Sequence, residues 1–208
     1  MSLPCTGPGP APAGNYRTRE FPRLRGLKGI PDSLMRSHLM LYKGYIKNVN
    51  LLHRRLKAAR IGTPEWAEMK RRVGFEINGM RLHELYFENL SPGKSRISST
   101  LKHALSAAWG SLVAWENEFA AMGRMRGIGW VVLYRDAAGG RLSNHWIGLH
   151  DQGHPVGFKP LLVMDVWEHA YRGLDRDGYV EAFLGNVDWE RVGIRLSGNP
   201  CPCASMPL

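Results

Sequence analysis

The stretch Asp165-Val166-Trp167-Glu168-His169-Ala170-Tyr171 follows directly on the apolar run Leu161–Met164. An aspartate at the end of a buried strand is expensive to desolvate unless a cation or strong hydrogen-bond donors compensate its charge. His169 lies four residues later, between two aromatic side chains, and adds a second type of metal ligand to the same apolar wall. The spacing alone fits two interpretations. Either Asp165 caps the next helix and His169 is a core histidine, or both residues bind a metal ion.

A candidate partner for this pair is His38, at the end of the segment Ile30–His38. Tyr45 follows seven residues later and opens the run Tyr45–Asn50. Seven residues turn an α-helix by about 700°, so His38 and Tyr45 share one helix face, two turns apart. On this evidence alone, Tyr45 fits an ordinary core tyrosine.

The third candidate is His83, in the segment Phe75–Pro92. This segment has enough apolar side chains to be buried as a helix, and Pro92 ends it. A single histidine on such a face is usually structural. With the other candidates, however, it makes three imidazoles and one carboxylate, a set that suits iron or manganese and leaves one position open. The set has no thiolate, which would favour structural zinc.

These residues carry a family resemblance. The string D-V-W-E-H-A-Y resembles the metal-binding signature of the iron/manganese superoxide dismutase family, and the segments around His38 and His83 resemble the two ligand-bearing helices of that family. Gly127–Trp130 and Asn186–Trp189 also resemble family segments. The resemblance extends from about residue 25 to 196.

The resemblance implies an enzyme that disproportionates superoxide to dioxygen and hydrogen peroxide at one iron or manganese ion per subunit. The residues expected to hold the ion are His38, His83, Asp165 and His169. Tyr45 would lie at the substrate entrance and relay protons with His150, both as catalytic residues. Trp130 and Trp167 would form apolar walls of the pocket.

His150 is expected to act from outside the ligand set. In the family, a glutamine or histidine hydrogen-bonds the metal-bound solvent and tunes the redox potential. Some members place it one helical turn before the second ligand, where this chain has Gly79 and no side chain. Others supply it from the hairpin before the signature, and His150 lies fifteen residues before Asp165. Gln152 is the main rival and Asp151 a weaker one, and His150 could also be an ordinary polar hairpin residue.

The chain departs from the family pattern in three places. Tyr45 follows His38 with one residue fewer than usual, which the absence of an extra-residue helix bulge would explain. The family's second histidine of the first helix, which touches the partner subunit, is missing. The segment after Tyr171 is about three residues shorter, and Arg172 replaces an aromatic residue. Glu168, which in the family pairs with the ligand histidine of the other subunit, is retained, so we expect a homodimer with Glu168 near the interface.

The sequence predicts an α+β fold, with a long N-terminal helical hairpin and then a mixed lobe in which helices surround a three-stranded antiparallel sheet. The predicted helices are Ile30–Leu56 with Asp32 or Ser33 as its cap, Thr63–Leu90 with Pro64 at its first position, Ser99–Ala108, Gly110–Gly123, Arg176–Leu184 and Trp189–Leu196. The predicted strands are Gly129–Tyr134, Arg141–Leu149 and Lys159–Met164, with a turn at Asp136–Gly140. The expected units are a disordered Pro/Gly-rich tail at 1–20, a helical hairpin domain at 21–92, an α/β domain at 93–196 and a flexible tail at 197–208.

The formal net charge of the 208-residue chain is +10. A positive field would speed the encounter with an anionic substrate such as superoxide. A nucleic-acid surface is the alternative. Its candidate cations are Arg17, Arg19, Arg23, Arg25, Lys28, Arg54, Arg55, Lys57, Arg60, Lys70, Arg71 and Arg72. Because they are spread over several helices without a stacking motif, nucleic acid is not the expected partner, and a solvated basic surface is favoured. A family-fold protein without dismutase turnover is a further alternative, which the shortened segment after Tyr171 motivates, and an iron site that activates dioxygen on an organic substrate is a minor one.

Cysteine usage and the N-terminal sequence bear on the compartment. Cys5, Cys201 and Cys203 all lie in the tails, so no disulfide framework is expected in the core, and the two C-terminal thiols fit either a soft-metal site or an unstructured tail. The N-terminus shows no basic segment followed by an apolar region, and no run approaches a transmembrane span. We therefore expect a cytoplasmic protein without a membrane partner.

Overall fold

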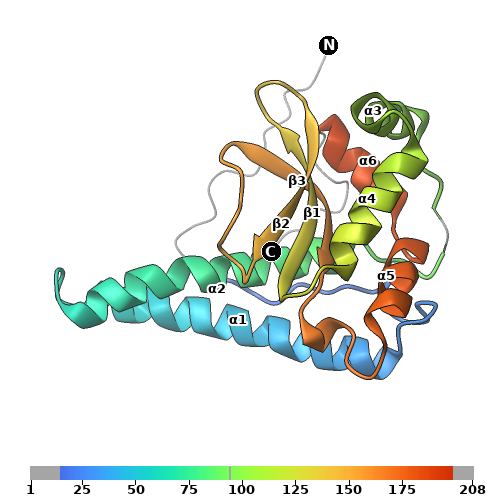
Figure 1. Cartoon of the computed structure of the whole chain (residues 1–208). Helices are drawn as coiled ribbons and strands as arrows, with labels where there is room; N and C mark the ends of the chain where they lie inside the picture. The colour runs from blue at the N-terminus through green and yellow to red at the C-terminus, as the bar shows by residue number, and fades with distance from the viewer. Residues whose placement is uncertain (1–14, 94, 199–208) are drawn as a thin grey trace, which may run out of the picture.

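Two long helices form a hairpin in the first half of a computed structural model, which describes residues 15–93 and 95–198. Helix α1 spans Asp32–Ala58 and helix α2 spans Pro64–Glu88. Both cross the molecule beneath the sheet, and their joined end projects beyond it (Figure 1). α1 is α-helical throughout, with no inserted π-type turn, as its shorter spacing between His38 and Tyr45 predicts.

The two helices begin differently. At α2 the prediction is confirmed, because the Thr63 hydroxyl accepts a 3.3 Å hydrogen bond from the Trp66 amide and Pro64 follows it. At α1 the predicted caps are wrong. Pro31 is the N-cap residue, no side chain caps the helix, and Asp32 is already helical. The carboxylate of Asp32 instead accepts a 2.9 Å hydrogen bond from Gly26 N and so holds the preceding loop.

The second half consists of a small sheet and surrounding helices, in the predicted chain order. The helices are α3 (Ser99–Trp109), α4 (Leu112–Arg124), α5 (Arg176–Gly185) and α6 (Trp189–Ser197), and the strands are β1 (Gly129–Asp136), β2 (Leu142–Gly148) and β3 (Phe158–Asp165). The predicted α+β fold is therefore confirmed, with boundaries shifted by a few residues. A short 3-10 helix, η1 (Glu168–Ala170), follows β3 and was not predicted.

The connection between β2 and β3 is not a hairpin, contrary to the expectation for the segment around His150. The sheet order is β2-β1-β3, and both neighbours are antiparallel to the central strand. The chain must therefore pass from one edge of the sheet to the other, and His150, just after β2, lies near the first residues of β1. At that end, Trp130 of β1 is paired with Asp165 of β3.

One apolar core runs through both halves of the chain. Its fully buried members include Tyr42 from α1, Met80 from α2 and Leu133 from β1. Residues 15–20, which the sequence places in a tail, lie against α1, where the Tyr16 amide donates a 2.8 Å hydrogen bond to Asn50. Residues 1–14 and 199–208, with the three cysteines, lie outside the described residues. In the described part of the chain, no helix combines the length and apolar character that a membrane crossing requires.

Candidate metal centre

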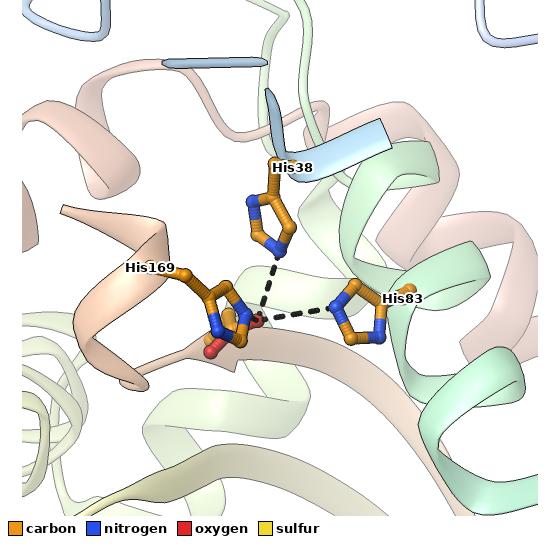
Figure 2. Close-up of side chains that lie close together, drawn as sticks. His38, His83 and His169 are labelled. Atoms are coloured by element: carbon orange, nitrogen blue, oxygen red, sulfur yellow. Dashed lines mark hydrogen bonds and ion pairs between the residues drawn. The ribbon is translucent and has the colours of Figure 1, made fainter. Parts of the chain in front are cut away.

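Four side chains from four separate elements converge on one point. They are His38 of α1, His83 of α2, Asp165 at the end of β3 and His169 of η1, and their ligand atoms lie within 4.8 Å of one another. Figure 2 shows the three imidazole rings turned toward the same place. The Nε2 atoms of His38 and His169 each lie 3.1 Å from Asp165 Oδ2, and Nε2 of His83 lies 3.8 Å from it.

The two carboxylate oxygens of Asp165 have different partners, one in the backbone and one in the site. Its Oδ1 accepts a 2.8 Å hydrogen bond from the Trp167 amide, which turns the chain into η1. Its carbonyl oxygen accepts a 2.7 Å hydrogen bond from the Tyr179 hydroxyl. These contacts fix the carboxylate and leave Oδ2 directed at the three rings. Asp165 is not the cap of η1, whose N-cap residue is Trp167 and which has no side-chain cap; its Oδ1 holds the turn before η1 while Oδ2 faces the rings.

His83 presents a free nitrogen to the centre. Its Nδ1 lies 2.6 Å from the carbonyl oxygen of Gly79, which can only accept, so Nδ1 carries the hydrogen and Nε2 keeps its lone pair. Nε2 is fully buried and has no hydrogen-bond partner among the described residues. Buried polar atoms are rarely left without a partner. A buried lone pair that faces a carboxylate and two other imidazoles is the arrangement a cation would complete.

Burial and charge keep this group ready to bind a cation. Burial lowers the pKa of His38, and it lowers the pKa of His83 well below the ordinary value, so both rings are neutral at pH 7. Burial alone would raise the pKa of Asp165, but the charge of His169 and the hydrogen bonds from His169 and His38 outweigh it and hold that pKa far below its usual range. Metal ligands must be deprotonated, and these three residues are.

Beside the four donors, Tyr45 and His150 form a hydrogen-bonded pair. The Tyr45 hydroxyl lies 2.7 Å from His150 Nε2. The indole of Trp130 donates a 3.0 Å hydrogen bond to His150 Nδ1. An indole N–H can only donate, so Nδ1 is the acceptor and Nε2 of the neutral ring donates to Tyr45. Burial lowers the pKa of His150 to about 4 and raises the pKa of Tyr45. Both groups are therefore neutral at pH 7.

Gly79 makes room for this pair. A Cβ atom at Gly79 would lie 2.6 Å from Cδ1 and Cε1 of Tyr45 and 3.2 Å from Cδ2 of His150. The position without a side chain in α2 is thus filled by these two rings. Tyr45 and His150 occupy the space that a side chain at residue 79 would need.

The backbone around His150 is held on both sides. Leu149 adopts a left-handed conformation with φ 54°, which is uncommon for a leucine. Its carbonyl oxygen accepts a 3.3 Å hydrogen bond from the Trp167 indole. The carbonyl oxygen of His150 lies 2.9 Å from Nε2 of His154, whose Nδ1 lies 2.7 Å from the Tyr134 hydroxyl. These contacts fix the ring of His150 against Tyr45.

The rival residue Gln152 points away from this cluster. It is exposed, and its backbone pairs with Gly148 through hydrogen bonds of 2.8 and 3.1 Å. Asp151 is exposed as well. His150 is fully buried, and its ring centroid lies 5.0 Å from that of Trp167 and 4.5 Å from that of Phe75. Of the three candidates, the structure brings only His150 to the centre.

Comparisons with known proteins agree with this arrangement. A family model described as "Iron/manganese superoxide dismutases, C-terminal domain" matches residues 97–195. An iron superoxide dismutase of Cupriavidus metallidurans is 35% identical over 181 residues, which cover 82% of this chain and 90% of the relative. The chain belongs to the iron/manganese superoxide dismutase family. An iron superoxide dismutase of Aquifex pyrophilus is 34% identical, over 83% of this chain and 86% of the relative. A manganese superoxide dismutase of Haloferax volcanii is 33% identical, over 74% of this chain and 80% of the relative.

Relatives of both metal types occur in the family, and the donor set of this member fits both. Three imidazole nitrogens and one carboxylate oxygen, with no thiolate, suit an iron or manganese ion. Nε2 of His83 is buried and has no hydrogen-bond partner among the described residues, and this observation of the structure favours a bound ion.

Three features of this family member were not predicted from its sequence. The Trp130 indole bonds to His150 in addition to lining the pocket, Phe75 packs against the same ring, and Tyr179 bonds to the Asp165 carbonyl. Trp130 and Trp167 do line the site as expected, with ring centroids 5.0 Å from His83 and 5.9 Å from His169.

Proposed function

We propose that the protein is a superoxide dismutase with one iron or manganese ion per subunit, held by His38, His83, Asp165 and His169. The observation that carries this proposal is the convergence of four donor atoms within 4.8 Å, one of them a buried nitrogen that has no hydrogen-bond partner in residues 15–93 and 95–198. The family membership and the names of the relatives as superoxide dismutases point the same way. When bound, the ion supplies one-electron chemistry by alternating between two oxidation states.

The protein's own residues supply protons and position. Two superoxide anions and two protons give one dioxygen and one hydrogen peroxide, so each turnover consumes two protons. Tyr45 is neutral, and its oxygen accepts from His150 Nε2, which leaves its own hydroxyl hydrogen free to donate into the site. Tyr45 would thus be the residue that donates a proton into the site, and His150 holds its hydroxyl group in place.

The Trp130 hydrogen bond restricts how protons can move. It occupies Nδ1 of His150, so no proton reaches the ring from that side. A proton enters or leaves the pair only on the side of Tyr45 and the site. Tyr45 therefore regains its proton from the site. His150 donates a fixed hydrogen bond to the tyrosine oxygen and does not pass protons on from Trp130.

Apolar walls complete the site. The indoles of Trp130 and Trp167, the latter half-buried, pack against the ligand histidines and His150. They limit competing solvent and strengthen the hydrogen bonds inside, because the surroundings have a low dielectric constant.

The direct test is metal analysis combined with an activity measurement. The purified protein is loaded with iron or with manganese, its metal content is measured by elemental analysis, and removal of superoxide is followed. We expect about one ion per chain, and turnover with at least one of the two metals. If stoichiometric loading with either metal removes superoxide no faster than the same concentration of free ion, the proposal is wrong.

The assembly and the compartment are part of the same proposal. Glu168 is exposed, and within the described part of the chain it makes no ion pair. His169 is 17% exposed and hydrogen-bonds through Nε2. A second copy that brings its own Glu168 to this histidine would complete the contact that the family resemblance implies, and we propose a homodimer. The proposed compartment is the cytoplasm, because the sequence offers no disulfide framework.

A further inference from the structure

Helix α1 carries basic side chains on its exposed side and no compensating acids. After Asp32 it contains no Asp or Glu up to its end at Ala58. Over the same length it has Arg36, Lys43, Lys47, Arg54, Arg55 and Lys57, all exposed. Within residues 15–93 and 95–198, none of these six forms an ion pair. A solvated helix face normally mixes both signs, and like charges one turn apart destabilise a helix.

Five of these cations lie along one line. At about 100° per residue, Arg36, Lys43, Lys47, Arg54 and Lys57 fall within an arc of about 80° on α1. The distance from the first to the last is about 30 Å, at about 1.5 Å per residue. We call these five residues the basic stripe. The buried residues His38, Tyr42 and Val49 lie on a neighbouring face of α1, about 100° to 140° from the centre of the stripe.

The elements that the structure describes leave the basic stripe exposed. α1 packs mainly on α2 along its length and on η1 near its beginning. The joined end of the two helices projects beyond the sheet, so the second half of the stripe is on an arm (Figure 1). The same arm adds the exposed cations Arg60 and Lys70, and also Arg71, which is paired with Glu68 at 3.0 Å. The sequence alone shows cations dispersed over several helices, whereas the structure aligns five of them.

We propose that the basic stripe binds the phosphate backbone of double-stranded nucleic acid, without base specificity. A duplex carries a dense row of negative charges, and a helix that presents several unpaired cations along one side is the electrostatic footprint of such binding. The stripe has no exposed aromatic side chain, because Tyr42 is buried and Tyr45 faces the metal centre. Single-stranded nucleic acid, which is held by base stacking on aromatic rings, fits less well.

Two other partners fit the stripe poorly. An amphipathic helix binds a membrane surface by inserting its apolar face, and the apolar face of α1 is buried in the fold. A second copy of the chain would bring the same positive stripe and the same net charge of +10 toward it. Association through this face would therefore be repulsive.

The test measures duplex binding by the metal-loaded, full-length protein as a function of salt. A fluorescent duplex of about 20 base pairs, longer than the stripe, is titrated and followed by anisotropy. We expect a dissociation constant of about 10⁻⁴ to 10⁻⁶ M at physiological salt, the usual range for non-specific binding. The logarithm of the binding constant should fall against the logarithm of the salt concentration with a slope of about −4, or about −0.9 per neutralised phosphate.

A matched pair of variants separates the stripe from the net charge. Lys43→Gln, Lys47→Gln, Arg54→Gln and Lys57→Gln together should weaken binding at least tenfold and reduce the slope to about −1. The control removes four exposed cations elsewhere, through Lys102→Gln, Arg126→Gln, Arg141→Gln and Lys159→Gln. The control should keep the slope near that of the unchanged protein. Circular dichroism and metal content establish that both variants are folded.

Three outcomes would overturn the proposal. One is an equal loss in both variants, which would make the binding a matter of net charge alone. Another is a slope that does not change in the stripe variant. The third is binding to vesicles that contain anionic phosphatidylserine but not to the duplex, which would assign the stripe to a membrane surface. All three are independent of whether the metal centre turns over superoxide.

Discussion

His83 shows how a single residue can reveal a metal site. Its Nδ1 is bound to the Gly79 carbonyl and its Nε2 is buried without a partner among the described residues. A core histidine with only a structural role would have both nitrogens satisfied. Spacing along the sequence does not show this difference, because it depends on which atoms surround the ring.

Replacing His83 or Asp165 with alanine should abolish metal retention and activity together. Each supplies a buried donor, and deleting it leaves the cation under-coordinated in an apolar cavity. Elemental analysis after dialysis against a chelator and an activity assay are the two measurements. Full occupancy with unchanged activity in either variant would remove that residue from the site.

His150→Ala should leave the metal bound and slow turnover by about 10- to 100-fold, the usual size of effects from groups that support the ligands. The variant loses the donor that orients Tyr45, so the pH dependence of turnover should also change. Gln152→Ala is the matched control and should have little effect, because Gln152 is exposed and bonds through its backbone. Equal effects of the two changes would contradict the assignment to His150.

The stability of the metal-free protein should fall as the pH decreases from about 6.5 to 4. Burial lowers the pKa of His150 in the folded state to about 4, whereas the ordinary value is 6.5. Between these pH values His150 is protonated in the unfolded chain but still largely neutral in the folded chain. The free energy of unfolding therefore decreases by about 3 kcal/mol. The lowered pKa values of His38 and His83 act in the same direction.

Urea unfolding of the metal-free protein at pH 7 and pH 4.5 measures this loss. His150→Gln, which cannot take up a proton, should lose less stability between the two pH values than the unchanged protein. A stability that rises as the pH falls through this window would contradict the assigned direction of the shift.

At the scale of the elements, one buried arginine joins three parts of the fold. The guanidinium of Arg195 in α6 is 13% exposed and forms an ion pair with Glu88. It also donates to the Asn89 side chain and to the carbonyl oxygens of Leu161 and Leu85. It therefore ties α6 to the end of α2 and to β3, the strand that leads to Asp165.

Arg195→Met should decrease the free energy of unfolding by about 1–3 kcal/mol, because it removes hydrogen bonds to the Asn89 side chain and the Leu161 carbonyl and one of the two arginines that pair with Glu88, the other being Arg19. Denaturant unfolding measures the effect. Lys159→Met, which removes an exposed cation from β3, should cost much less. A similar small loss in both variants would show that the contacts of Arg195 with α2 and β3 do not stabilise the fold.

The elements were predictable where their signals are local. Thr63-Pro64 marks the beginning of α2, and the order of helices and strands follows from apolar periodicity. Two predictions failed because the deciding contacts are not local. Asp32 is not a cap because its carboxylate bonds to Gly26 N, and the segment with His150 is not a hairpin because β1 lies between β2 and β3.

The residues of the candidate site were predictable from long motifs that resemble those of the family. The spacing between the residues would not have been enough. His38 and Asp165 are 127 residues apart and share a 3.1 Å contact that no local pattern contains. The bond from Trp130 to His150 was missed for the same reason, since tryptophan at a strand end predicts only a buried wall.

At the scale of the whole molecule, the proposed dimer depends on the short segment after Tyr171. Light scattering at micromolar concentration should give at least twice the chain mass, and Glu168→Ala should shift the protein toward monomer. The reason is that Glu168 is exposed beside His169 and makes no ion pair within the described residues. A fully active monomer would show that the shorter segment has removed the family interface.

The four donors are residues 38, 83, 165 and 169, two from each half of the described chain. During synthesis the chain grows from its N-terminus, and the last donor emerges only after more than three quarters of the protein has been made. No earlier fragment contains the complete set, so the nascent chain cannot load the ion while it is still growing through its first lobe. A choice between iron and manganese that uses all four donors therefore comes only after residue 169 has been made.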